Sequence, residues 1–192
     1  MKNRLIDRRS VVLWLGASLA LLAARPALAL DFPDWYTIGN AASLNKTDDV
    51  LFMLRRGDNP NMYDGNGRTP LDYAASFGNA PMAQALLENG ARADYRDTFG
   101  NSALHWAAEG GKLDVVRVLL TAKAPVDATN KQGITPLMQA AGRGRNEVVR
   151  ALLAAGADPK KQDFTGRDAE GWAQGQPNVM RTLQAAHPLA TR

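Results

Sequence analysis

The chain has 192 residues, of which 45% are hydrophobic and 22% are charged, as is ordinary for one modest globular domain. Its formal net charge is +4, and its pI is about 9.6. It contains no cysteine, which excludes disulfide bonds, a thiolate nucleophile and cysteine-ligated metal sites.

The first 29 residues have the features of a secretory signal peptide. Basic residues between Lys2 and Arg9 precede an uncharged apolar run over 11–24, and the small residues Ala27 and Ala29 suit a signal peptidase. The run is shorter than the ~20 residues that a transmembrane helix needs. We therefore expect a signal peptide at 1–29, cleaved after Ala29. The expected product is periplasmic or secreted and has no stable membrane anchor.

Removal of this segment changes the charge of the chain. Residues 30–192 contain 18 basic and 18 acidic residues, so the high pI belongs mostly to the signal peptide. Nucleic-acid binding requires a basic surface on the mature domain. We therefore expect no nucleic-acid partner.

Several features of the remaining chain recur every 33 residues. Glycines stand at 67, 100, 133 and 166, and the first three open the segments Gly-Arg-Thr-Pro-Leu, Gly-Asn-Ser-Ala-Leu and Gly-Ile-Thr-Pro-Leu. Alanine pairs and then apolar pairs keep this register: 41–42, 74–75, 107–108 and 140–141, and 53–54, 86–87, 119–120 and 152–153. Such a period is typical of stacked structural repeats.

Each copy is interpreted as two helices joined by a turn. Thr69, Ser102 and Thr135 are suitable N-caps for the first helix, since their side chains can accept a bond from free backbone N–H groups. Glycines at 78, 111 and 144 are suited to end it in a left-handed conformation. The paired leucines place an apolar face on the second helix, which glycines at 57, 90 and 156 close.

These residues resemble the ankyrin repeat, whose motif reads G-x-T-P-L-H-x-A-A-x-x-G, then a second helix ending L-L-x-x-G-A-D. The resemblance is clearest over 104–108 and 152–158. It implies an all-α ankyrin-repeat solenoid of about five helix-turn-helix units joined by β-hairpin loops. The expected boundaries are a repeat domain at 30–187 and a tail at 188–192, with an N-terminal cap repeat at 31–63, central repeats at 64–96, 97–129 and 130–162, and a C-terminal cap repeat at 163–187.

Some positions depart from the motif. Lys123 replaces the glycine after the second helix of the third copy, so a less regular turn is expected there. The first copy lacks Thr-Pro-Leu, and the last has a shortened inter-helix segment, as suits the terminal caps of a solenoid. Tyr73, Trp106 and Trp172 precede the alanine pair, where the family keeps an apolar packing residue, and are assigned to the core.

Residues with catalytic potential are few. His105 occupies the histidine position of the motif and is interpreted as structural, bonded to the backbone of a neighbouring loop. Asp163, Asp168 and Glu170 are interpreted as a solvated cap surface. No metal site and no cofactor are predicted, and we expect that the protein is not an enzyme.

The resemblance also implies where a partner binds. Ankyrin proteins usually contact partners with the hairpin tips and with exposed positions of the first helices, which line a concave face. The hairpin positions here are Asn66, Arg68, Phe99, Asn101, Gln132, Ile134, Thr165 and Arg167. The helix positions are Ser76, Phe77, Glu109, Gly110, Gly142 and Arg143.

The character of this surface leaves two questions open. Phe77, Phe99 and Ile134 either anchor a partner or fold back onto their own hairpins. A basic cluster either attracts an acidic partner or forms a solvated face. Its members are Arg143, Arg145, Arg150, Lys160 and Lys161.

Four functional hypotheses follow. The first is an adaptor or accessory factor that binds an exported protein, and the second is an inhibitor or immunity-type protein that occludes the active site of a partner enzyme. Self-association also stays open. An enzyme with a site between repeats would need a polar pocket with perturbed titratable groups, for which the sequence offers little.

Overall fold

The computed structural model describes residues 36–186, and the predicted signal peptide and tail lie outside this range. Within it, ten helices follow one another in pairs, and no residue is in a strand. The first helices of the pairs are α2 (Ile38–Ser43), α4 (Pro70–Phe77), α6 (Ala103–Gly110), α8 (Pro136–Gly142) and α10 (Ala169–Trp172). The second helices are α3 (Thr47–Arg56), α5 (Ala80–Glu88), α7 (Leu113–Thr121), α9 (Asn146–Ala154) and α11 (Pro177–Ala186).

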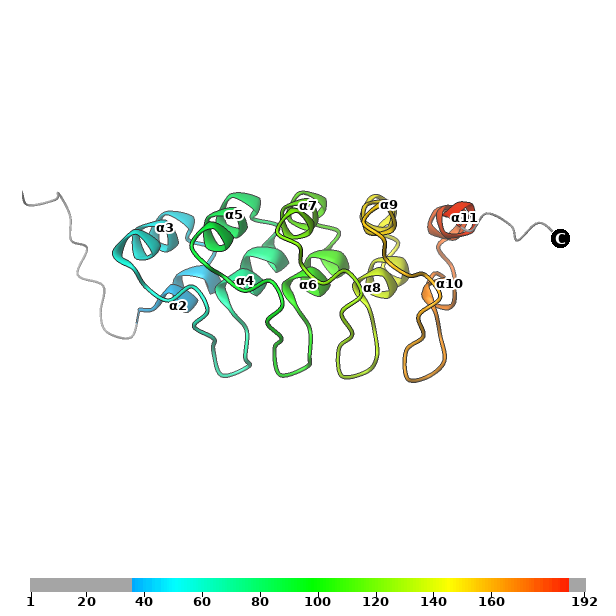
Figure 1. The fold of residues 1–192 in the computed structure, drawn as a ribbon, viewed down its shortest axis with the longest axis horizontal. Coiled ribbons are helices and arrows are strands. Elements are labelled where there is room, and N and C mark those ends of the chain that lie inside the picture. The colour runs from blue at the N-terminus through cyan, green and yellow to red at the C-terminus, as the bar shows by residue number, and fades with distance from the viewer. Residues whose placement is uncertain (1–35, 187–192) are drawn as a thin grey trace, which may run out of the picture. The chain divides into compact units, whose positions relative to one another are not determined.

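The helices form two layers, and hairpin-shaped loops project beyond the layer of first helices (Figure 1). Each first helix packs against the first helices of its neighbours as well as against its own second helix. The all-α solenoid of about five repeats is therefore confirmed for the described residues.

The first helices begin as the sequence predicts. The hydroxyls of Thr69 and Thr135 accept bonds from backbone N–H groups three residues later, and proline occupies the first helical position. Proline lacks an N–H, and at this position the N–H would have no helical partner. The inner surfaces are made of small residues, because both alanines of each pair are fully buried. Neighbouring first helices can consequently approach closely.

The turns after the helices depend on left-handed backbone. Gly78 and Gly90 have φ angles of 81° and 88°, which residues with a Cβ rarely adopt. Asn45 and Lys123 stand at the corresponding positions of other repeats and adopt φ angles of 55° and 59°. The turn at Lys123 thus keeps the left-handed conformation of the repeat, although a side chain is unfavourable there.

The last repeat differs from the others in its first helix. Helix α10 has only four residues, so the shortening falls within the helix and not, as predicted, in the segment between the two helices. Asp168 caps this helix by accepting a bond from the Gly171 N–H at 2.9 Å. Val179 and Leu183 of α11 are buried, and the shorter unit still contributes to the core.

Candidate protein-binding surface

The hairpin loops are organised by one side chain at the same position in each repeat. The Oδ1 atom of Asp97 accepts bonds from the backbone N–H groups of Phe99 and Asn101, both at 2.9 Å. Asp64, Asn130 and Asp163 accept the equivalent pairs of bonds in their own loops. This device satisfies the loop backbone internally and fixes the shape of each hairpin.

Neighbouring hairpins are also bonded to one another. The N–H groups of Thr98, Lys131 and Phe164 donate to carbonyls of the preceding loop at 3.0–3.1 Å. Gly100 has a φ angle of 82°, and a Cβ there would lie 2.8 Å from the Lys131 nitrogen. Only glycine therefore fits at this contact. The result is a continuous row of loops held in one arrangement.

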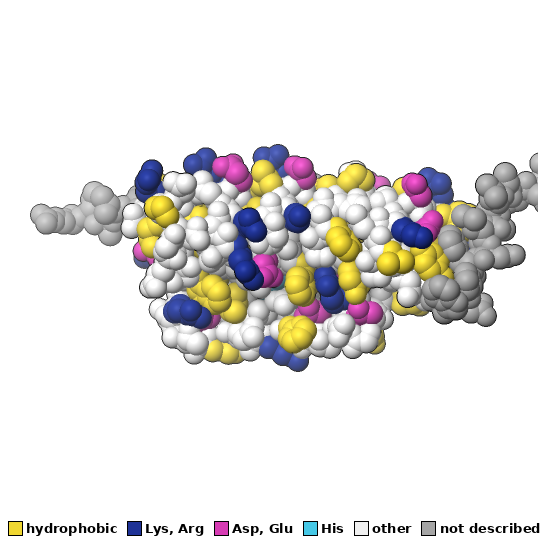
Figure 2. Space-filling model, turned by 180° about the vertical axis from the view of Figure 1, so that it is seen from behind, with side chains coloured by type: hydrophobic (Ala, Val, Ile, Leu, Met, Phe, Trp, Pro, Cys, Tyr) yellow, Lys and Arg dark blue, Asp and Glu magenta, His cyan; other side chains and the backbone are white. Residues whose placement is uncertain are grey.

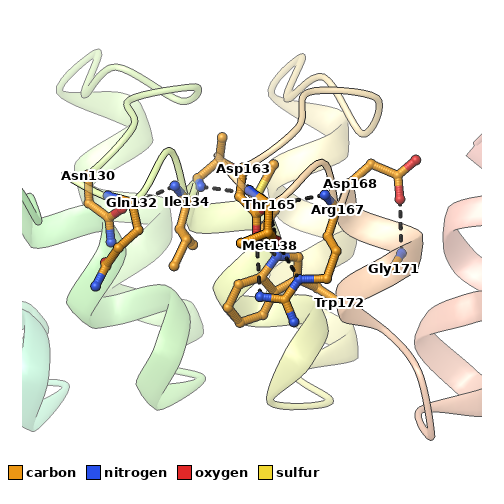
Figure 3. A network of polar contacts seen from close by, with 11 residues as sticks. Asn130, Gln132, Ile134, Met138, Asp163, Thr165, Arg167, Asp168, Gly171 and Trp172 are labelled. Carbon is orange, nitrogen blue, oxygen red and sulfur yellow. Dashed lines mark hydrogen bonds and ion pairs between the residues drawn. The ribbon is translucent and has the colours of Figure 1, made fainter.

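In three of the four hairpins the organising carboxylate is tied to the first helix by an aromatic side chain. The Tyr73 hydroxyl donates to Asp64 Oδ2 at 2.5 Å, and the Trp106 indole N–H donates to Asp97 Oδ2 at 3.2 Å. The Trp172 indole donates to the last carboxylate, that of Asp163, at 2.9 Å (Figure 3). These three aromatic residues are half-buried, so the prediction that they belong to the core is only partly correct.

The hairpin of the fourth repeat lacks this hydrogen bond between an aromatic side chain and a carboxylate. Asn130 takes the place of the aspartate, and its side-chain amide donates to Asn101 Oδ1 at 3.0 Å. Gln139 takes the place of the aromatic residue. Its Oε1 atom is buried and has no hydrogen-bond partner among the described residues.

Two arginines predicted to contact a partner are held by aromatic rings. The Arg68 guanidinium lies 4.3 Å from the ring centres of both Tyr73 and Trp106. That of Arg167 lies 4.5 Å from the Trp172 ring, and its Nη2 is 3.3 Å from Asp163 Oδ2. Cation–π contacts of this kind restrain a charged side chain. Arg68 thereby links two repeats.

The remaining predicted positions differ in exposure. Phe77 and Phe99 expose 45% and 59% of their surface and do not fold away into the core. Asn66, Gln132, Thr165 and Arg143 are exposed, whereas Ser76, Glu109, Gly110, Ile134 and Gly142 are half-buried. Asn101 is buried and bonded to Asn130, so the prediction that it faces a partner is wrong.

Sequence reasoning missed several exposed apolar side chains. Leu44, Met62, Tyr63 and Phe164 expose between 45% and 80% of their surface. Leu44 stands 33 residues before Phe77, so the repeat register could have found it. A pocket of about 350 Å³ lies between α2 and the first hairpin. Met62, Tyr63 and Tyr73 contribute to its lining.

Three members of the predicted basic cluster lie beside acidic side chains. Arg150 lies 3.9 Å from Glu147, Lys161 lies 4.0 Å from Asp127, and Arg143 pairs with Glu109. The face in Figure 2 likewise shows hydrophobic side chains in separate groups, with charged side chains of both signs between them.

Asp163 does not belong to a solvated surface, because it is buried within the last hairpin. Burial alone would raise its pKa, but the bonds that it accepts from Thr165, Arg167 and Trp172 hold the pKa well below its usual range. The interpretation of this residue as a solvated acid is therefore wrong. Its carboxylate stabilises the loop.

His105 and Asp72 occupy the same repeat position, and both are buried in capping boxes. His105 Nδ1 accepts the Ser102 backbone N–H at 3.1 Å, and Nε2 donates to the Ile134 carbonyl at 3.1 Å, so the predicted bond to a neighbouring loop is confirmed. Burial lowers the pKa of His105 to about 4 and raises that of Asp72 to about 6. Asp72 accepts bonds from the Thr69 N–H and hydroxyl at 2.8 Å.

Between 36 and 186 no group of three or more histidine, aspartate or glutamate side chains is placed to hold a metal ion. In the same range no helix is both long enough and apolar enough to cross a membrane.

Stacked helix pairs with a row of bonded hairpins define a helical repeat protein. A family model for three copies of the ankyrin repeat matches residues 38–130 and 86–163. The chain belongs to the ankyrin-repeat family, whose repeats form protein-binding modules on a scaffold that is typically not catalytic. None of the curated proteins matches the sequence.

Proposed function

We propose that this protein binds another exported protein as an adaptor or accessory factor, through the face formed by its hairpins and first helices. The observation that carries the proposal is the exposure of Phe77 and Phe99 at two levels of this face. Exposed aromatic side chains often dominate the binding energy of protein interfaces.

The hairpin that carries Phe99 gives this side chain a rigid support. Phe99 lies in a loop whose backbone is bonded internally to Asp97 and to the neighbouring hairpin through Lys131. A surface that is already ordered loses little conformational entropy on binding. The arrangement thus suits recognition of a folded partner or of an exposed segment.

We propose no catalytic role. Two of the buried residues with strongly shifted pKa values, Asp72 and His105, are enclosed in capping bonds at the starts of their helices. In such bonds the titratable atoms of Asp72 and His105 are already hydrogen-bonded to backbone groups. Their shifted pKa values are accounted for by burial in the scaffold.

Affinity capture tests the binding face. The mature domain is compared with a Phe77→Ala, Phe99→Ala variant and with a Leu87→Ala, Val118→Ala control, which removes apolar atoms from the groove between α5 and α7. We expect one protein to be retained by the parent and the control and lost with the aromatic variant, while all three show the same circular dichroism. Loss with the control alone would place binding on the second helices.

The captured protein decides between adaptor and inhibitor. If it is an enzyme, its activity is measured with and without the ankyrin domain. Unchanged or increased activity supports an accessory role, whereas loss of activity supports the inhibitor or immunity-type alternative. If the immobilised parent domain retains only further copies of the same domain, the result would instead support self-association.

We also propose export to the periplasm or outside the cell, on the basis of the signal-like sequence over 1–29. The test is fractionation of a bacterium that expresses the full chain, followed by mass spectrometry of the product. We expect a protein that begins at Leu30 in the periplasm or medium. An uncleaved chain in the cytoplasm contradicts the proposal.

A further inference from the structure

The turns that join first to second helices form a rim along the solenoid, and its composition changes from one end to the other. Leu44 and Phe77 stand at the same repeat position at the ends of α2 and α4, and both are exposed. The next two repeats carry Gly110 and Arg143 there. At this position the rim is consequently apolar in the first two repeats and basic in the fourth.

Two further cations lie on this rim two residues later in the repeat, namely Lys112 and Arg145. A Cβ on Gly78 would lie 2.7 Å from Lys112 Cδ, so the lysine stem crosses the turn directly after Phe77. A Cβ on Gly111 would likewise lie 2.7 Å from Arg145 Cδ. Each cation therefore reaches back over the turn of the preceding repeat, and the two follow Phe77 in order.

These two cations lack carboxylate partners. Among the described residues, no Asp or Glu carboxylate oxygen lies within 4.0 Å of the charged nitrogens of Lys112 or Arg145. The Arg145 Nε donates only to the backbone carbonyl of Glu109, at 3.2 Å. The Glu109 carboxylate itself is paired with Arg143. The rim around the two cations thus has an excess of positive charge.

The charge of the wider region has the same sign. Residues 111–186 contain eleven Lys and Arg against seven Asp and Glu, whereas residues 36–110 contain six against nine. Summed charges of one sign attract an oppositely charged segment and orient it as it approaches. The asymmetry therefore gives a bound segment a preferred direction along the solenoid.

We propose that the rim of Phe77, Lys112 and Arg145 receives a segment of the partner protein in which an apolar side chain is followed by acidic side chains. The apolar side chain contacts Phe77, and the carboxylates contact Lys112 and Arg145. The inference rests on the proposed function and adds to it the chemistry of the partner and the direction of its chain.

The structural roles of Lys112 and Arg145 do not require their positive charges. Lys112 and Arg145 are the N-cap residues of α7 and α9, and neither side chain makes a capping hydrogen bond. Their aliphatic stems cover glycine turns, which a glutamine stem would still do in part. Glutamine substitutions should therefore remove charge while leaving the helices in place.

The test uses two synthetic peptides of the same length. In one, a phenylalanine is followed by a run of glutamates, and in the other glutamines replace the glutamates. Binding to the mature domain is measured by fluorescence anisotropy at low and at physiological ionic strength. We expect the acidic peptide to bind about tenfold more tightly at low salt, with a smaller difference at higher salt, since exposed ion pairs are weak and screened.

Variants then locate the effect. Lys112→Gln with Arg145→Gln should abolish the difference between the peptides. The control, Arg150→Gln with Arg181→Gln, removes the same charge from α9 and α11 and should retain the difference. Phe77→Ala should weaken both peptides by the same factor.

Several outcomes overturn the inference. Equal affinities for the two peptides, absence of binding by both, or equal losses in the two charge variants would each contradict it. Binding of a single-stranded oligonucleotide with the same dependence on Lys112 and Arg145 would show a polyanion site instead. The proposed function fails separately, if capture of the natural partner does not depend on Phe77 and Phe99.

Discussion

The third repeat (97–129) and the fourth repeat (130–162) reach the same backbone arrangement with different side chains. In the third, His105 bonds to the Ile134 carbonyl of the next hairpin, whereas Met138 of the fourth makes only a 3.5 Å contact from its sulfur to the Thr135 N–H. The third closes its second helix with Lys123, and the fourth with glycine.

Their hairpins differ in the same way. Asp97 is tied to the Trp106 indole, while the fourth repeat has Asn130 and a buried Gln139 oxygen without a partner among the described residues. The comparison teaches that caps, alanine pairs and left-handed turns determine the repeat backbone. The variable polar contacts determine how stable each unit is and how it responds to pH.

The largest expected effect is at the position of His105. His105→Ala removes the partner of a buried and of a part-buried backbone group and leaves a cavity, so we expect the free energy of unfolding to fall by about 3 kcal/mol. Met138→Leu, a change of similar volume at the equivalent position, should cost less than about 1.5 kcal/mol. Urea denaturation of both variants measures this, and equal losses would contradict the difference between the repeats.

The stability of the second and third repeats should depend on pH in opposite ways, because Asp72 and His105 occupy the same repeat position. The pKa of His105 falls from 6.5 to about 4 on folding, so its contribution is complete above pH 6.5 and is lost as the pH falls toward 4. The pKa of Asp72 rises from 3.8 to about 6, so its contribution is complete below pH 3.8 and is lost as the pH rises through 6. Each contribution is of the order of 3 kcal/mol.

The two trends oppose each other between pH 4 and 6, and variants can separate them. Relative to the parent, Asp72→Asn should lose stability on acidification, because the opposing trend is removed. His105→Met should gain stability over the same interval. Thermal unfolding at a series of pH values provides the measurement. Identical pH profiles for parent and Asp72→Asn would show that folding does not raise the pKa of Asp72.

Substitutions at the equivalent positions 106 and 139 should change the free energy of unfolding in opposite directions. Trp106→Phe leaves the Asp97 carboxylate without its indole donor, and we expect a loss of about 1–2 kcal/mol. Gln139→Leu removes a buried oxygen that has no partner, and we expect a gain of about 1 kcal/mol. Both are read from urea denaturation midpoints. A loss on Gln139→Leu would mean that the amide is satisfied in solution.

The smallest effect concerns the turn after the second helix. Lys123→Gly removes a side chain from a left-handed position, which should raise stability by about 0.5–1 kcal/mol. Gly156→Lys makes the reverse change in the fourth repeat and should lower stability by a similar or larger amount. Differential scanning calorimetry detects both shifts, and stabilisation by Gly156→Lys would contradict the role assigned to φ.

The repeat backbone could be predicted because its determinants are local and recur every 33 residues. N-caps, glycine turns and alanine pairs each act within a few residues, so Thr69 or Gly78 carries the same meaning wherever it recurs. The bond from His105 to a neighbouring loop also followed from its place in the motif.

Contacts that form only when the hairpins fold against the helices and against one another could not be predicted in this way. Asp97 and Asp163 have the composition of a solvated turn, and only the fold brings an indole N–H from the following helix to each carboxylate. Arg68 lies between two rings that belong to different repeats, and no local pattern indicates such a contact. The burial of Asn101 likewise depends on the neighbouring hairpin.

The most direct test of the proposed binding face is photo-crosslinking in living cells. A photoreactive amino acid is placed at Phe77 or Phe99, and in control variants at Gln84 or Arg117 on the second helices. We predict that the first two positions form an adduct with one and the same protein and that the control positions do not. Adducts from the second helices alone, or none from Phe77 and Phe99, would contradict the assignment of the hairpins and first helices as the binding surface.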